Sequence, residues 1–352
     1  MENNTPVFYN AETVRRVLNW PLVNEAVEMA LKAGAALAPP PAGGPYVNQP
    51  QRSFTVVGNE PHNLLLTMPA FVGDYALTLD GSAGDAMNVR RQTLACKLVT
   101  SFRSNEQRRP PLPAVMANIL LFNSSTGQLE CIMDGTDITN WRTAAASLVA
   151  TKYLYFRRFG AHSEQSREIT VSIVGCGAQG RFHATAMCAN FRVKQLNLWN
   201  RTEAKAVQLA EQLRFQFGDR IPISVCSSTR VACQNADVIC IATYSREPLI
   251  CIDDLSKERS IHINAVGAGE VHFGELANDI YAEAEVYVDS RASAAIELRD
   301  LPASIVAEVG EVILDGNYPD ERALSVFQSL GMASEDTCVA QAVHEALMSG
   351  IK

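Results

Sequence analysis

A glycine-rich turn is the sequence feature whose residue types most directly suggest chemistry. Gly175-Cys-Gly177-Ala-Gln-Gly180 follows the apolar run ITVSIV and precedes a helical pattern. In that context the first glycine permits a tight turn, the second lets the backbone approach a pyrophosphate, and the third lets helix and strand pack closely. The pattern predicts a dinucleotide site, in which Ala178 and Gln179 begin the helix whose N–H groups face the phosphates.

The segment Asn200-Arg201-Thr202 should select the nicotinamide cofactor, because it ends the next predicted strand. An acidic residue there would bind the ribose 2′-hydroxyl and repel a 2′-phosphate. Arg201 is instead a permanent cation whose planar donors suit phosphate, and Thr202 adds a hydroxyl at a helix start. The segment favours NADPH; the alternative is that Arg201 is an ordinary solvated arginine.

Alternating β-rich and helical segments surround this turn. The strand candidates are ITVSIVG, KQLNLWN, ISVCSS, ADVICIAT, SIHINAVG and AEVYVDS. Such alternation is typical of a doubly wound parallel sheet. We therefore expect an α/β protein whose residues 142–324 form a Rossmann-type domain that binds NADPH.

The first 141 residues follow a different pattern. A helical stretch around Thr13–Leu37 ends at the proline- and glycine-rich residues 39–50, and short apolar runs then alternate with turn-forming clusters up to Asp134. Residues 79–95 look like a mobile excursion between two strands. We expect an α+β domain with an antiparallel sheet over residues 1–141, completed by residues 325–352, and a connecting helix that starts near Trp141.

Composition limits the classes of function. The 352 residues fit about two domains, and the net charge of −8 argues against a large surface for nucleic acid or anionic lipid. The nine cysteines form no CxxC pair and the six histidines are not clustered, so no disulfide scaffold or metal site is expected. The N-terminus MENNTPVFYN has no signal-peptide pattern, and no apolar run reaches the ~20 residues of a membrane helix, so a cytoplasmic protein is expected.

Several blocks of residues carry a more specific resemblance. They are Cys96-Lys97-Leu-Val-Thr100, Asp134-Gly135, Arg142-Thr143-Ala-Ala-Ala146, Trp199-Asn200-Arg201-Thr202, His262-Ile-Asn264-Ala-Val-Gly267, Tyr287-Val-Asp289-Ser290, and Ser329-Leu-Gly-Met332 with Glu335-Asp336-Thr337. In this order they resemble the ornithine cyclodeaminase/μ-crystallin family over nearly the whole chain, and its μ-crystallin branch most closely. The resemblance implies an NADPH-dependent ketimine reductase, and a homodimer whose first domain holds the substrate and pairs across the two-fold axis.

Three basic residues match those that the family places around the substrate carboxylate: Arg52, Lys97 and Arg142. Two guanidiniums can grip a carboxylate, and a lysine beside them should have a lowered pKa and could hold or deliver a proton near neutral pH. The alternative for each residue alone is a solvated surface charge. Unpaired buried charges are rare, which makes that alternative weaker for Lys97 and Arg142, because both lie within apolar or alanine-rich segments.

The resemblance implies further contacts. Cofactor contacts beyond the two motifs above would come from Arg142, Thr143, Thr243, Val266 and Ser329, and substrate contacts from Arg52, Lys97, Gly269, Phe273, Glu297 and Leu330. A surface salt bridge explains Glu297 equally well. His272 could be a second proton donor, although a lone loop histidine is more often a bystander, and Cys176 is interpreted as a small filler in the glycine turn.

Two departures from the family bear on the reaction. Its cyclodeaminases carry an aspartate where this chain has Ala268-Gly269, and a glutamate where Thr67 precedes Met68-Pro69. Hydride transfer to a preformed C=N bond needs neither carboxylate, so reduction of cyclic ketimines of the pyrroline- or piperideine-2-carboxylate type is favoured. The alternatives are a cyclodeaminase or amino-acid dehydrogenase on the same scaffold, and a protein that binds NADPH and an aromatic carboxylate resembling thyroid hormone, or has a structural lens role.

Overall fold

The computed structural model of the chain describes residues 5–36, 40, 43–59, 63–78, 90–267 and 273–350. The chain divides into two compact units, one formed by Met1–Arg142 with Gly331–Lys352 and the other by Thr143–Leu330. The second unit thus extends six residues beyond the expected end at 324, because residues 324–328 form a strand of its sheet.

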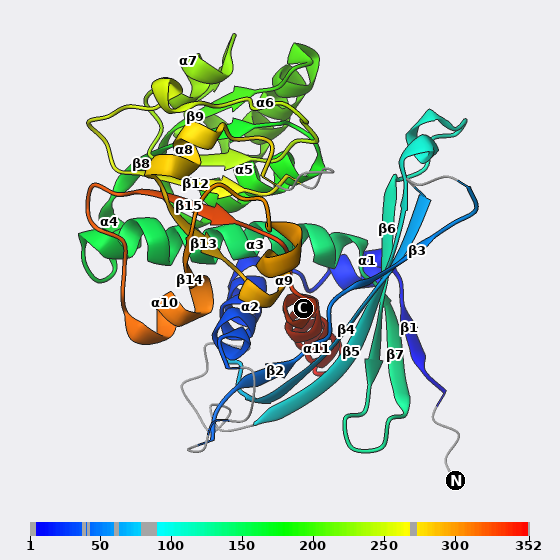
Figure 1. Cartoon of the computed structure of the whole chain (residues 1–352). Coiled ribbons are helices and arrows are strands. Elements are labelled where there is room, and N and C mark those ends of the chain that lie inside the picture. Colours follow the sequence, from blue (N-terminus) through cyan, green and yellow to red (C-terminus); the bar gives the residue numbers. More distant parts are fainter. Residues whose placement is uncertain are drawn as a thin grey trace. The chain divides into compact units, whose positions relative to one another are not determined.

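The first unit is an antiparallel sheet packed against helices (Figure 1). In the described part of the chain the strand order is β1-β7-β6-β5-β4-β2, with β3 paired to β4 and β1 parallel to β7. The elements are β1 (Val7–Tyr9), α1 (Ala11–Arg15), α2 (Trp20–Gly34), β2 (Tyr46–Asn48), β3 (Ser53–Val56), β4 (Asn63–Tyr75), β5 (Arg91–Phe102), η2 (Arg103–Gln107), β6 (Val115–Phe122), β7 (Leu129–Asp134) and α11 (Ala333–Met348).

The side chains of β5 alternate between buried and more exposed positions. Thr93, Ala95, Lys97 and Val99 are buried, whereas the residues between them are more exposed, as the two-residue period of a strand requires. Helix α11 packs on β4, β5 and β6, and α2 packs on α11. A lysine therefore occupies a core position beneath the C-terminal helix.

Several predicted boundaries were wrong. The stretch Thr13–Leu37 forms two helices, because the side chain of Asn19 accepts the Leu22 N–H at 3.0 Å and caps a new helix, α2, that has a proline in its first turn. That helix ends at Gly34, and Leu37 lies outside the described residues. Residues 91–95 belong to β5 rather than to a loop, and residues 79–89 lie outside the described residues.

The second unit is a parallel sheet with helices on its faces, which confirms the predicted doubly wound α/β fold (Figure 1). Its described strands follow the order β10-β9-β8-β11-β12-β15-β13-β14, so β8 and β11 flank the point where the strand order reverses. The predicted strands are present, and β14 and β15 are additional. Helix α3 begins at Thr136, five residues before the expected Trp141, because the Asp134 side chain accepts the Thr136 N–H at 3.0 Å.

The remaining elements belong to this unit, except that residues 136–142 of α3 belong to the first unit. They are α3 (Thr136–Thr151), η3 (Lys152–Phe156), η4 (Arg157–Phe159), α4 (Ser163–Ser166), β8 (Glu168–Val174), α5 (Ala178–Asn190), β9 (Arg192–Trp199), α6 (Glu203–Phe217), η5 (Gly218–Arg220), β10 (Ile223–Val225), α7 (Thr229–Cys233), β11 (Val238–Ile241), η6 (Ile252–Asp254), β12 (Ile261–Ala265), α8 (Asn278–Glu283), β13 (Glu285–Val288), α9 (Arg291–Glu297), β14 (Ile305–Glu308), α10 (Val309–Asp315) and β15 (Leu324–Gln328). Among the described helices, none combines the length and apolar composition that crossing a membrane requires.

Candidate active site

The first unit gathers the three predicted basic residues around the start of α11. Lys97 lies near the middle of β5, where it pairs in register with Met68 of β4 and Ile119 of β6, and it is 2% exposed. Arg142 comes from α3 and is also buried, and Arg52 immediately precedes β3. Three segments far apart in the sequence therefore bring cations to one buried place.

Two carboxylates of α11 pair with these cations. The Lys97 ammonium lies 2.5 Å from Asp336 Oδ2, and Arg142 lies 3.0 Å from Glu335 Oε2 and 3.3 Å from Asp336 Oδ1. Both carboxylate side chains are at most 2% exposed. Lys97 and Arg142 are thus held by acids in the core, and their cationic donors together with Arg52 are of the kind that binds a carboxylate.

Gly331 allows the two arginines to approach the same loop. Its carbonyl accepts a hydrogen bond of 2.9 Å from Arg52 Nη2. Its φ of +80° is in the left-handed region, and a Cβ on it would lie only 2.6 Å from Arg142 Nη1. A glycine is therefore needed here both for the backbone turn and for the guanidinium beside it.

Burial, as the largest cause, lowers the pKa of Lys97 from its ordinary 10.5 to about 8. Asp336 opposes this effect through its charge and its hydrogen bond, while Arg142 and Arg52 add to it. A lysine with such a pKa is protonated at neutral pH and yields its proton more readily than a surface lysine does. The cluster can therefore both bind a carboxylate and supply a proton.

The glycine turn of the second unit has the geometry that its motif requires. Gly175 has a φ of +101° and donates its N–H to the Trp199 carbonyl at 2.9 Å. A Cβ on Gly180 would lie 1.8 Å from the Gly175 carbonyl oxygen, so this glycine lets α5 pack against the end of β8. A Cβ on Gly177 would meet nothing within 4 Å, which leaves space beside the backbone at the start of α5.

Ala178 and Gln179 open α5, and no side chain caps its N-terminus at Gly177. Cys176 in the same turn is buried, and burial raises the pKa of its thiol to about 12. A thiol with that pKa stays protonated and is a poor nucleophile. The N–H groups at the start of α5 are thus the groups of this turn that are suited to binding an anion.

The segment that was predicted to select the cofactor lies beside the turn. Asn200 Oδ1 accepts the Cys176 N–H at 2.9 Å, and its Nδ2 donates to the Thr202 carbonyl at 2.9 Å. Asn200 therefore ties the glycine turn to the segment before α6. Arg201 and Thr202 are exposed, with Thr202 at the N-cap of α6.

The other predicted cofactor residues follow the carboxyl ends of neighbouring strands. Val266 donates its N–H to the Ile241 carbonyl at 2.9 Å, and Ser329 donates to the Ala265 carbonyl at 3.0 Å. The Thr243 N–H bonds to the buried carboxylate of Glu275 at 2.5 Å. Ligands of open α/β sheets bind at these strand ends, and the predicted cofactor residues of this unit share that edge of the sheet.

Glu275 itself was not predicted from the sequence. In addition to its bond with Thr243, the Glu275 carboxylate lies against Gly267. A Cβ on Gly267 would be only 1.9 Å from Glu275 Oε2. One buried acid thus accepts a hydrogen bond from the loop that follows β11 and lies against the loop that follows β12. A single glutamate in the loop segment VHFGELAND gave no pattern by which to find it.

Two of the predicted substrate residues of the second unit share one apolar cluster, with Leu330 in its core and Phe273 packed against it. Leu330 donates its N–H to Asp289 at 2.9 Å. Phe273 packs edge-on against Tyr281, with ring centroids 6.1 Å apart, and Glu297 is half-buried at the last position of α9. Thr143 is buried in α3. Gly269, His272 and Ala268 lie outside the described residues.

Two buried histidines are not candidates for proton transfer. Burial lowers the pKa of His183 to about 4 and that of His262 to about 3. His183 contacts the Ser147 hydroxyl at 2.9 Å, and His262 contacts Ser325 and Asn264. Both rings are neutral at physiological pH and belong to the core of the second unit.

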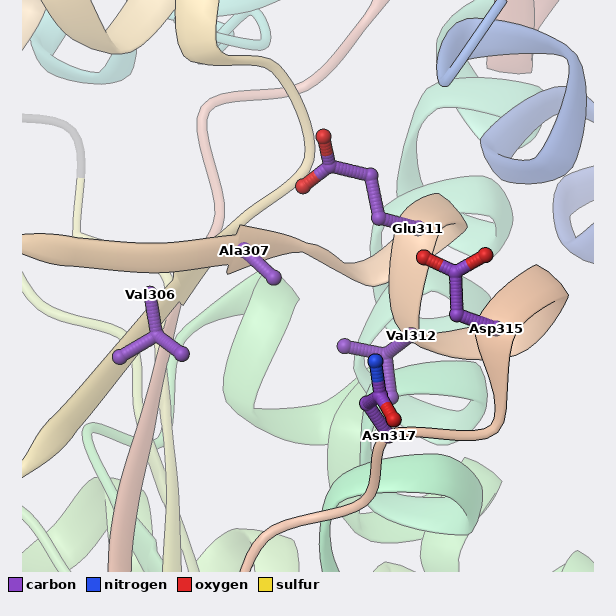
Figure 2. Close-up of a pocket in the computed structure, with 6 residues that line it drawn as sticks. All are labelled: Val306, Ala307, Glu311, Val312, Asp315 and Asn317. Carbon is purple, nitrogen blue, oxygen red and sulfur yellow. The ribbon is translucent and has the colours of Figure 1, made fainter.

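Figure 2 shows a pocket elsewhere in the second unit, lined by Val306, Ala307, Glu311, Val312, Asp315 and Asn317. Its charged lining is acidic, and Glu311 already pairs with Arg291 at 3.2 Å and accepts the Glu308 N–H at 2.8 Å. An acidic lining repels carboxylates and phosphates. This pocket therefore suits neither the predicted substrate nor the cofactor. The described side chains also form no group of three or more that could hold a metal ion.

Comparison with known proteins gives a consistent result. A model of the ornithine cyclodeaminase/mu-crystallin family matches residues 83–350. The chain is 34% identical over 349 residues to the ketimine reductase mu-crystallin of Mus musculus, with 98% of both chains covered. It is 30% identical over 268 residues to a Delta(1)-pyrroline-2-carboxylate reductase of Bacillus cereus, covering 72% of this chain and 77% of that one.

A solved structure is similar over the same length. The Delta(1)-pyrroline-2-carboxylate reductase of Thermococcus litoralis, in complex with NADH and L-proline, is 25% identical with a TM-score of 0.76, and the match covers 98% of both chains. The sequence comparison and the structure comparison thus both find similarity to Delta(1)-pyrroline-2-carboxylate reductases.

Proposed function

Because the chain belongs to the ornithine cyclodeaminase/mu-crystallin family, we propose that it is an NADPH-dependent reductase of cyclic ketimines that carry a carboxylate. The observation that carries this proposal is the buried cluster in which Lys97 lies among two guanidiniums. The names of the relatives support the same reaction class, since they are ketimine and pyrroline-2-carboxylate reductases. The substrates would be imines of the pyrroline- or piperideine-2-carboxylate type.

Each residue of the cluster has a distinct role in this reaction. Arg52 and Arg142 bind the substrate carboxylate, and Lys97 places a proton on the imine nitrogen or keeps it there. When bound, NADPH would be the source of the hydride that the imine carbon requires. One hydride and one proton convert the C=N bond to a CH–NH bond, so the reaction balances without a metal ion. The first unit would thus bind the substrate and the second the cofactor.

A panel of substrates tests the proposal. Cyclic imines with a 2-carboxylate should cause NADPH oxidation, whereas the same rings without the carboxylate should be poor substrates, because they lose the contacts with both arginines. L-Ornithine with oxidised cofactor should yield neither proline nor ammonia above background, since Thr67 stands where cyclodeaminases have a glutamate. Ammonia release from ornithine would contradict the assignment to reduction.

Cofactor choice is tested at Arg201. Arg201→Asp replaces an attraction for the 2′-phosphate by a repulsion and should shift the preference for NADPH over NADH by roughly 1.5–3 kcal/mol, the range of a hydrogen bond to a charged group. The dissociation constants of both cofactors, measured at one moderate salt concentration, check this. Equal binding of NADH and NADPH by the wild type would contradict the role of Arg201.

The proposal includes a homodimer formed through the first unit. The face of the antiparallel sheet opposite to the buried positions is apolar, with Leu94, Cys96 and Leu98 of β5 half-buried beside Leu65 and Phe71 of β4. Large exposed apolar faces are typical of interfaces. Sedimentation should therefore give a dimer, and a monomer at micromolar concentration would contradict it.

We place the reaction in the cytoplasm, where NADPH and free thiols such as the nine cysteines of this chain are maintained.

A further inference from the structure

The first turn of α11 contains an unusual pair of acids. Glu335 and Asp336 follow the helix start at Ala333, where acidic residues ordinarily face solvent and stabilise the helix dipole. Here they are 0% and 1% exposed. Burying two carboxylates costs several kcal/mol unless partners compensate for the lost hydration. Their placement therefore needs an explanation beyond helix stability.

We propose that Asp336 is a positioning residue that retains the proton of Lys97, and that Glu335 is a positioning residue that orients Arg142 toward the substrate carboxylate. This inference rests on the proposed function. It assigns the two adjacent acids separate roles, one in proton transfer and one in substrate binding.

The geometry around Lys97 supports the first role. Asp336 Oδ2 lies 2.5 Å from the Lys97 nitrogen, and the other charged groups that act on this lysine are the cations Arg142 of α3 and Arg52 before β3. Burial and both cations favour the neutral amine, whereas Asp336 favours the ammonium. An ammonium has three donors, so a bond to Asp336 leaves two for the substrate. Asp336 therefore decides whether Lys97 carries a proton to deliver.

The contacts of Glu335 support the second role. Its carboxylate pairs with Arg142 Nη1 at 3.0 Å, while Arg142 Nε lies 3.3 Å from Asp336. The acid that raises the pKa of Lys97 through its charge and its hydrogen bond is Asp336, whereas Glu335 pairs with Arg142. Two contacts on one planar guanidinium determine its orientation. The orientation matters because a guanidinium must face a carboxylate correctly to form a bidentate hydrogen-bonded pair with it. Loss of Glu335 should thus affect substrate binding more than proton delivery.

Two isosteric variants separate these roles from a purely structural one. In Asp336→Asn the falling limb of the kcat–pH profile should move to lower pH by roughly 1–3 units, the shift that an adjacent opposite charge causes, and kcat at neutral pH should fall more than KM changes. In Glu335→Gln the limb should stay in place while KM for the imine rises. Glu345→Gln is the matched control, because Glu345 pairs with Arg91 at 2.8 Å on the same helix, outside this cluster.

A measurement without substrate tests the same claim. With 13C-labelled lysine, the Lys97 signal, identified by its loss in Lys97→Met, should titrate near pH 8 in the wild type and at lower pH in Asp336→Asn. Should Asp336→Asn fail to fold, the wild type suffices: the 13C signal of the Asp336 carboxyl should shift at the pH at which Lys97 titrates.

The outcomes are distinct. The role of Asp336 would be overturned if Lys97 titrated at the same pH in Asp336→Asn as in the wild type. It would also be overturned if the Asp336 carboxyl signal of the wild type did not shift at the pH at which Lys97 titrates. An unchanged KM in Glu335→Gln would overturn the role of Glu335. Absence of ketimine reduction by the wild type, together with the expected shift of the Lys97 titration, would instead reject the proposed function and leave the Lys97–Asp336 coupling intact.

Discussion

Lys97→Met is expected to lower kcat by about 10²–10⁴, the range for loss of a general acid. Methionine has a similar volume and an unbranched chain, so it should fit between Met68 and Ile119 without disturbing the second unit. NADPH affinity should therefore stay unchanged. Steady-state kinetics with a cyclic 2-carboxylate imine, together with NADPH titration, measure both effects.

Arg52→Met provides the comparison, because Arg52 is assigned to carboxylate binding alone. It should raise KM more than it lowers kcat, provided that the arginine binds ground and transition states about equally. The pH profile gives a second difference. Activity of the wild type should decline as pH rises through about 8, where Lys97 loses its proton, and Lys97→Met should lose that limb. Wild-type kcat with only a raised KM in Lys97→Met would make Lys97 a carboxylate ligand and leave the proton to another donor.

Gly180→Ala is expected to destabilise the second unit by about 3 kcal/mol or more, because its Cβ would lie 1.8 Å from the Gly175 carbonyl oxygen. For a unit of this size the melting temperature should fall by roughly 6–12 °C. The clash is with backbone, so no side chain can move to relieve it. Thermal unfolding monitored by circular dichroism measures the loss.

Gly177→Ala is the matched control within the same turn. Its Cβ would meet nothing within 4 Å, so the melting temperature should not change. The methyl group would nevertheless occupy the space through which the pyrophosphate reaches the backbone, so NADPH affinity should fall roughly tenfold or more, about 1.4 kcal/mol. Equal effects of the two substitutions on stability would contradict the distinct roles of these glycines.

The sequence predicted the second unit well because its signals are local. The parallel strands are short segments rich in Val and Ile, of which VICI of β11 is entirely apolar, and the glycine turn follows β8 directly, so that β8 through β13 could be recognised from the chain itself. β15 was missed as a strand because LSVFQ lies directly before the C-terminal helix, where the change of pattern was interpreted as a return to the first domain. Its partners β12 and β13 are distant in sequence.

The candidate site was predicted only in part, because its contacts join distant segments. Lys97 and Arg142 stood out as charges within apolar or alanine-rich segments, and the structure places both in the core. The same reasoning applies to Glu335 and Asp336, which begin a helix that is otherwise largely buried and apolar. Two buried cations require buried anions nearby, so a search for acids in apolar segments would have found them. The pairing itself spans more than 190 residues and depends on the fold.

The central claim is hydride transfer from NADPH to the carbon of a carboxylate-bearing cyclic imine. Incubation of the purified chain with NADPH that carries deuterium at both hydrogen positions of nicotinamide C4 and a pyrroline- or piperideine-2-carboxylate tests it most directly, with mass spectrometry and NMR of the product. We expect one deuterium at C2 of the cyclic amino acid for each NADPH oxidised, and none in Lys97→Met beyond its residual rate. Tight NADPH binding without any deuterated product would contradict the account and indicate a protein that binds the cofactor without using it as a reductant.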